Sequence, residues 1–153
     1  MAEGVENFDL MEYLDSIDEK ASIKRAKKYL ERVKELQDTV RVNPNYLQSP
    51  KMDGMPKGSQ GNSSQMESFI MKREKVKDEL KQVVQAIKML ETIQVSGMSC
   101  GELLTKKYIT KISDVSIYLE FSVSQSTYHR GLNKALYCFA EAFQDGRLLV
   151  IND

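Results

Sequence analysis

The chain has 153 residues, and its 22 lysines and arginines balance 22 aspartates and glutamates, so the formal net charge is zero. Hydrophobic residues make up 41% and charged residues 29%, which is typical of a globular chain. No apolar run approaches the ~20 residues that cross a bilayer, and the acidic start lacks the apolar stretch of a signal peptide. Two cysteines and one histidine argue against a disulfide scaffold or a zinc cluster. We therefore expect a cytoplasmic protein without a membrane partner.

Residues 1–19 form an acidic arm with seven carboxylates and no basic side chain. Apolar residues in it, among them Leu10, Leu14 and Ile17, are spaced so that they can share one face of a short helix. Two interpretations stay open. The segment is either an acidic arm that frays at its end, or an acidic amphipathic segment that docks on a basic surface.

Residues 20–42 are predicted to form a basic helix, because apolar residues such as Ile23, Leu30 and Val33 recur at helical spacing. Eight basic side chains exceed three carboxylates in this segment. Such a helix can contact phosphates or another anionic surface, or it can simply present a solvated face. Residues 43–64 contain all three prolines and little that could be buried, so they are predicted to be a linker.

Residues 65–95 are predicted to form one long helix, which Ser64 and Glu67 would open as a capping box. Its apolar residues alternate at spacings of four and three, interrupted by Arg73, as in a short coiled coil or a helical hairpin. The seam consists of Phe69, Val76, Leu80, Val83, Ile87 and Leu90. Its partner is either the basic helix of the same chain or the same helix of a second chain, and both alternatives stay open.

Residues 99–146 are predicted to form a helix-turn-helix domain, followed by an apolar tail at residues 147–153. Three helices are expected, at about 102–109, 113–120 and 124–143. Ser113 and Ser124 are the predicted N-caps of the second and third helix. The tail either tucks under the last helix or crosses to a second subunit. The predicted fold class is therefore all-α, with a basic helix, a linker, a coiled-coil-like helix and a C-terminal helix-turn-helix.

The last helix carries the candidate DNA-binding residues. In a helix-turn-helix, the start of the second helix of the pair enters the major groove, where polar side chains contact base edges and phosphates. Residues at spacings of three and four predict its buried stripe, namely Tyr128, Leu132, Ala135, Leu136, Phe139 and Phe143. Suitable side chains outside this stripe are Ser124, Gln125, Ser126, Thr127, His129, Arg130, Asn133 and Lys134. Three lysines that precede the pair, Lys106, Lys107 and Lys111, are expected to neutralise phosphate charge. The pattern predicts double-stranded DNA as the partner.

Other residues that could carry chemistry fit structural roles better. The serine, histidine and aspartate residues lie in no nucleophile motif and no glycine-rich phosphate loop is present, so we expect no enzymatic activity, metal or cofactor. Cys100 and Cys138 are expected to be a loop thiol and a small buried residue. Gly131 is expected to weaken the last helix by roughly 1 kcal/mol relative to alanine.

Two stretches carry a resemblance to a known family. Residues 49–59 read SPKMDGMPKGS, with a Ser-Pro pair followed by Met-Pro-Lys, and residues 111–143 contain the helix-turn-helix. Both resemble the ArpU/RinA-like regulators of phage late genes in Gram-positive bacteria, whose helix-turn-helix is similar to region four of sigma factors. The order of parts agrees as well. The family has a small residue where this chain has Tyr118, and it has glycine where this chain has Ser122. A residue other than glycine is disfavoured at positive φ in such a turn.

The resemblance implies a transcription regulator, namely an activator of phage or prophage late genes for packaging, morphogenesis or lysis. It also implies promoter DNA and RNA polymerase as partners and a homodimeric state. The alternative is a non-enzymatic adaptor or anti-repressor that acts on RNA polymerase or on a repressor. In that case the helical seam and the acidic arm would carry the function, and the helix-turn-helix would only be a packing unit.

Overall fold

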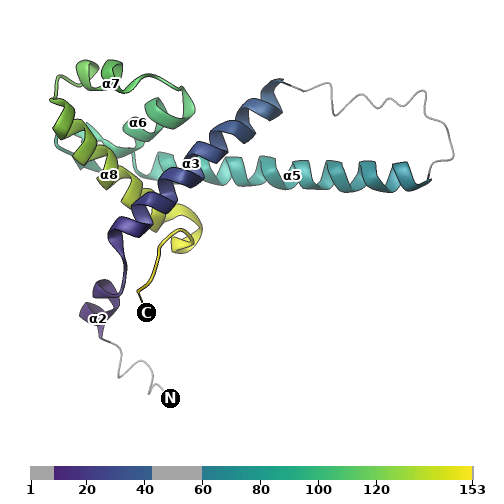
Figure 1. The fold of residues 1–153 in the computed structure, drawn as a ribbon, viewed down its shortest axis with the longest axis horizontal. Coiled ribbons are helices and arrows are strands. Elements are labelled where there is room, and N and C mark those ends of the chain that lie inside the picture. Colours follow the sequence, from purple (N-terminus) through teal and green to yellow (C-terminus); the bar gives the residue numbers. More distant parts are fainter. Residues whose placement is uncertain (1–8, 43–59, 153) are drawn as a thin grey trace.

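The fold is all-α, as predicted, and a computed structural model describes residues 9–42 and 60–152 of the chain (Figure 1). The elements are α2 (Leu10–Asp15), α3 (Glu19–Val42), α5 (Gln60–Met89), β1 (Gln94–Val95), β2 (Met98–Ser99), α6 (Cys100–Leu104), the π-helical turn η1 (Thr105–Ile109), α7 (Asp114–Glu120), α8 (Gln125–Ala142) and the 3₁₀ turn η2 (Phe143–Gly146). The two strands pair as one small antiparallel hairpin. The first part of the acidic arm, most of the predicted linker and its Ser-Pro stretch lie outside the described residues.

Helix α8 lies at the centre of the fold, where α3 crosses it and α5, α6 and η2 pack around it (Figure 1). Its predicted apolar stripe is confirmed as buried: Tyr128, Leu132, Ala135, Leu136, Phe139 and Phe143. The ring of Tyr29 on α3 packs against Phe139 and Phe143, with ring centroids 6.4 and 5.1 Å apart. The predicted basic helix, long helix and helix-turn-helix therefore contribute to one hydrophobic core.

Helix α5 differs from the predicted long helix at both ends. It begins at Gln60 rather than near Ser64, because a Ser-x-x-Glu pattern is also compatible with a helix interior and does not fix the first residue. It ends at Met89 rather than at residue 95. Ser96 and Gly97 take positive φ values of 54° and 80°, which turns the chain into the β1–β2 hairpin.

The apolar seam of α5 is divided between the core and the surface. Val83, Ile87 and Leu90 are buried in the core that α6 and α8 share. Val76 and Leu80 are half-buried beside α3, and Phe69 is exposed. The C-terminal half of the seam is thus used within the chain. The pairing with α3 is a crossing rather than a hairpin along the whole helix (Figure 1).

The apolar tail packs within the described chain: Leu148 is buried in the core that α8 shares, and the following residues pair with the segment before α3. Ile151 forms an antiparallel bridge with Ile17, and the Asp18 amide donates to the Val150 carbonyl at 2.8 Å. The Val150 amide in turn donates to the hydroxyl of Ser22, a fully buried polar residue, at 2.8 Å. We call these paired segments, residues 16–18 and 150–152, the terminal clasp. The clasp fixes the residues that directly follow α2, and so fixes where α2 is attached to the rest of the fold.

Candidate nucleic-acid interface

Helices α7 and α8 form the predicted pair, and a serine caps each of them. The Ser113 hydroxyl accepts from the Ser116 amide at 3.2 Å, and the Ser124 hydroxyl accepts from the Thr127 amide at 3.1 Å. Both predicted N-caps are therefore confirmed. Between the helices Ser122 has a φ of 59°, in the left-handed region where glycine would cost less.

The helix that precedes the pair begins two residues earlier than predicted and is less regular. It begins at Cys100 and changes after Leu104 into the π-helical turn η1. The Ser99 hydroxyl caps it by accepting from the Glu102 amide at 3.2 Å. Two of the three lysines predicted to bind phosphate lie in η1. Such turns often coincide with functional positions, although this one also aligns side chains toward α7.

A carboxylate at the start of α7 connects three elements. Asp114 Oδ1 accepts from the Tyr128 hydroxyl at 2.6 Å and from Lys107 Nζ at 2.8 Å, which joins η1, α7 and the second turn of α8. Burial and this hydrogen bond raise the pKa of the Tyr128 phenol well above its ordinary value. Desolvation acts to raise the pKa of Asp114, but the hydrogen bonds from Lys107 and Tyr128 outweigh it and the pKa is lowered. We call this arrangement the Asp114 bridge.

The side chains predicted to contact DNA lie on the face of α8 that the core leaves open. Exposed among them are Ser124, Gln125, Ser126, His129, Arg130, Asn133 and Lys134. Thr127 is half-buried and accepts from Arg130 Nη2 at 3.3 Å. The first turn of α8 contains no acidic residue, so its amides and the helix dipole favour an anion at this end. We call the exposed residues from 125 to 134 the polar strip.

The three lysines predicted to neutralise phosphate each pair with a carboxylate of the same chain. The pairs are Lys106 with Glu120 (3.0 Å) and Glu102 (3.7 Å), Lys107 with Asp114 (2.8 Å), and Lys111 with Asp38 on α3. A phosphate would therefore have to compete with a carboxylate at each position. Their contribution to DNA affinity should be smaller than that of free lysines, and their role in binding stays a prediction.

Sequence reasoning missed most of the partners of these lysines because they lie on other elements: Asp114 and Glu120 on α7, and Asp38 on α3. Asp114 looks like a first-turn acid that complements the dipole of its own helix, and nothing local shows that Tyr128 reaches it. One signal was present. A tyrosine in a buried stripe needs an acceptor for its hydroxyl, so Tyr128 required a polar neighbour from another element.

Gly131 has a packing role that helix propensity did not reveal. It is buried in α8, and a Cβ there would lie 2.7 Å from Met98 Cε and 3.1 Å from Val95 Cγ1. The missing side chain allows the β1–β2 hairpin to approach the middle of α8. The hairpin thus covers the side of α8 that faces away from the polar strip.

Cys100 is buried at the start of α6 rather than exposed in a loop, which corrects the expectation. It lies within hydrogen-bonding reach of Cys138, and burial raises the pKa of its thiol to about 11. Burial also raises the pKa of Cys138. Cys138, expected to be buried, is half-buried and packs against the core, and both thiols stay protonated at neutral pH and are poor nucleophiles.

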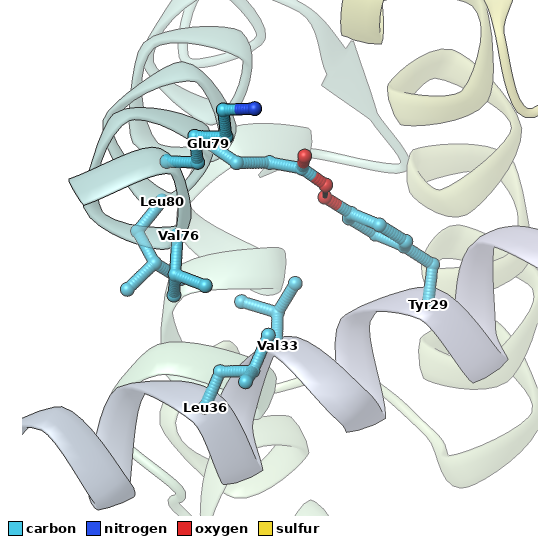
Figure 2. Close-up of a pocket in the computed structure, with 7 residues that line it drawn as sticks. Tyr29, Val33, Leu36, Val76, Glu79 and Leu80 are labelled. Atoms are coloured by element: carbon cyan, nitrogen blue, oxygen red, sulfur yellow. Dashed lines mark hydrogen bonds between the residues drawn. The ribbon is translucent and has the colours of Figure 1, made fainter. Parts of the chain in front are cut away.

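A cavity of about 150 Å³ lies between α3 and α5 (Figure 2). Its lining is formed by Tyr29, Val33 and Leu36 of α3 and by Lys75, Val76, Glu79 and Leu80 of α5. The Tyr29 hydroxyl donates to the Glu79 carboxylate across it, as Figure 2 shows. We call this cavity the α3–α5 groove. Its other lining is largely aliphatic, which suits an apolar side chain better than a polar substrate.

Two further searches bear on the choice of function. Within residues 9–42 and 60–152, no histidine, cysteine, aspartate and glutamate side chains gather in groups of three or more that could hold a metal ion. In the same ranges, no helix has both the length and the apolar character needed to span a bilayer. Comparisons of the chain with protein families, curated proteins and solved structures found no match. The geometry of α7 and α8 is therefore the basis for a functional conclusion.

Proposed function

We propose that the chain is a sequence-specific DNA-binding transcription regulator in which α8 enters the major groove. The observation that carries the proposal is the polar strip on the second helix of a serine-capped helix-turn-helix. Its side chains are those that pair with base edges: Arg130 with guanine, and Gln125 or Asn133 with adenine. The amides at the start of α8 and the Ser126 hydroxyl can donate hydrogen bonds to phosphate oxygens of the DNA backbone.

The electrostatics around the strip favour selective over indiscriminate binding. The net charge of the chain is zero, and the lysines that precede α7 are paired with carboxylates. Lysines that are paired with carboxylates release fewer counterions on binding than free lysines, so the nonspecific affinity of this surface for DNA should be low. Specific affinity would then come from contacts to bases and from a second copy of the chain on the DNA, as in a homodimer.

The family resemblance supports a narrower role within this function. We propose an activator of phage or prophage late genes, acting in the cytoplasm of a bacterial host at promoter DNA, with RNA polymerase as a further partner. The adaptor alternative is favoured by one observation: all six residues of α2 are exposed, as a segment for protein contacts would be.

The test is selection of DNA ligands from a randomised library, followed by fluorescence anisotropy on the enriched sequence. We expect one sequence to be enriched and Arg130→Ala to weaken its binding about tenfold to a hundredfold. Loss of discrimination at a guanine should accompany the loss of affinity. Lys134→Ala should weaken all sequences about equally, because lysine contacts phosphate as a point charge.

The matched control is Lys24→Ala, an exposed cation on α3 that lies outside the polar strip. It should leave the specific affinity unchanged. Enrichment of no sequence, or equal losses for Arg130→Ala and Lys24→Ala, would reject the assignment of α8 as the recognition helix and favour the adaptor alternative.

A further inference from the structure

The short helix α2 presents apolar side chains that the rest of the described chain leaves uncovered. Leu10, Met11 and Leu14 are 58%, 64% and 51% exposed. The Asp9 carboxylate caps the helix by accepting from the amides of Met11 and Glu12 at 3.0 and 3.4 Å. A single helical turn has no stability of its own in water, and the terminal clasp holds only its C-terminal side. The feature therefore indicates a segment that gains its stability from a contact.

The charge of this segment restricts the partner. Residues 9–18 contain Asp9, Glu12, Asp15 and Asp18 and no lysine or arginine. An acidic helix with exposed leucines at i and i+4 fits an apolar groove with a basic surround. Helices α3 and α5 supply positive charge around the groove, because cations outnumber carboxylates over the whole length of each helix, while the groove lining itself holds one lysine and one glutamate, Lys75 and Glu79. These cations include Lys28, Arg32, Lys72 and Lys75.

The α3–α5 groove has the matching shape and lining. Its volume of about 150 Å³ is comparable to that of a cavity that accepts a benzene-sized group, so it has room for the end of one aliphatic side chain. Leu36 at its edge is 43% exposed, and Val33, Val76 and Leu80 form its wall (Figure 2). An incoming leucine would cover the exposed part of Leu36 and fill the space beside it.

We propose that α2 of one copy docks in the α3–α5 groove of a second copy. The same copy cannot supply it, because α2 lies at the N-terminal end of α3 whereas the groove is lined by residues 29–36 in the middle of that helix, roughly 15–25 Å along it. The terminal clasp also fixes α2 at its own end (Figure 1). Reciprocal docking of two arms closes a twofold dimer that does not require the N-terminal half of α5 as a coiled-coil seam. This inference does not rest on DNA binding.

Sedimentation velocity on the full chain tests the proposal. Wild-type protein should be dimeric at micromolar concentration, and the double variant Leu10→Ser, Leu14→Ser should raise the dissociation constant about tenfold or more. Leu36→Glu, which places a carboxylate at the edge of the groove, should do the same. The matched control is Val115→Ser with Leu119→Ser, which alters two equally exposed apolar residues on α7 and should leave the dimer intact.

A second measurement locates the contact directly. A photo-crosslinking amino acid in place of Met11 should give an inter-chain product whose linked peptide contains residues 29–36 or 75–80. Adding salt should weaken the dimer, because acidic and basic surfaces meet in it. The proposal is overturned if the wild-type protein is monomeric, or if neither the Leu10→Ser, Leu14→Ser double variant nor Leu36→Glu weakens the dimer. A crosslink to any other surface, or within one chain, would also overturn it.

Discussion

Replacing Gly101 by alanine tests the packing of α6 against the end of α5. By helix propensity alone alanine should be better than glycine by about 1 kcal/mol. The structure predicts the opposite sign, because a Cβ on Gly101 would lie 2.6 Å from the Ile87 carbonyl oxygen and 2.8 Å from the Glu91 amide nitrogen. Both are backbone atoms and cannot rotate away. The amide of Gly101 also donates to the Leu90 carbonyl at 3.1 Å, which holds the two helices together at this point.

The magnitude follows from the displacement that the methyl group requires. Helix α6 would have to move away from α5, and its buried residues Leu103 and Leu104 would move with it. Overpacking of a well-packed core costs about 1–3 kcal/mol, and contacts under 3 Å with backbone atoms place this case in the upper half of that range, from which the propensity gain of about 1 kcal/mol is subtracted. We expect the free energy of unfolding to fall by about 1–2 kcal/mol, or the melting temperature by about 2–8 °C.

Urea unfolding followed by circular dichroism at the helix band measures this change. The control is Gly131→Ala, also in a buried helical position, where the new Cβ meets the flexible end of Met98. Because that methionine can turn away, Gly131→Ala should cost less than Gly101→Ala. If Gly101→Ala unfolds at the same or a higher urea concentration than wild type, with an unchanged slope, the described contact between α5 and α6 is wrong.

Two further predictions concern the α7–α8 pair. Ser122→Gly should raise the free energy of unfolding by up to about 1 kcal/mol, because Ser122 has a φ of 59°; a lower melting temperature would contradict the left-handed turn. Tyr128→Phe should lower stability by about 1 kcal/mol at neutral pH in urea unfolding, since Asp114 loses a hydrogen-bond donor. The folded state lowers the pKa of Asp114. The Asp114 bridge therefore stabilises the fold fully at pH values above the unfolded pKa of about 3.9. This stabilisation disappears as the pH falls through the lower pKa of the folded state. Asp114→Asn should therefore flatten the decline in stability below about pH 4, and a decline parallel to that of wild type would show that the bridge does not contribute.

The sequence was most informative where local signals determine the structure. The serine caps and the apolar stripe of α8 were predicted correctly, because capping and helical periodicity depend on residues within a few positions of each other. The end of α5 was predicted poorly. The hairpin around Ser96 and Gly97 depends on strands only two residues long, which leave too short a pattern to predict.

At the candidate interface, too, the features set by local sequence were predicted and those set by tertiary packing were not. The exposed face of α8 followed from its periodicity, so the position of the polar strip on the surface could be predicted. The pairing of Lys107 with Asp114 and of Lys111 with Asp38 could not be, because these residues meet only after η1, α7 and α3 have packed. A count of lysines before the motif therefore overestimated the positive charge that this surface offers to DNA.

The crossing of α3 over α8 has a consequence for the order of folding. The contacts of α8 with α6 and α7 join near neighbours in sequence, whereas its contacts with α3 join segments about a hundred residues apart. Local contacts close first and distant ones later, because loop closure costs entropy before any contact offsets it. We infer that the C-terminal helices collapse early and that α3 adds last. Doubling the length of the connection between α3 and α5 would then lower the free energy of unfolding by only about 0.6 kcal/mol. It would change the rate of the folding step in which α3 docks on α8 more than the stability of the folded state.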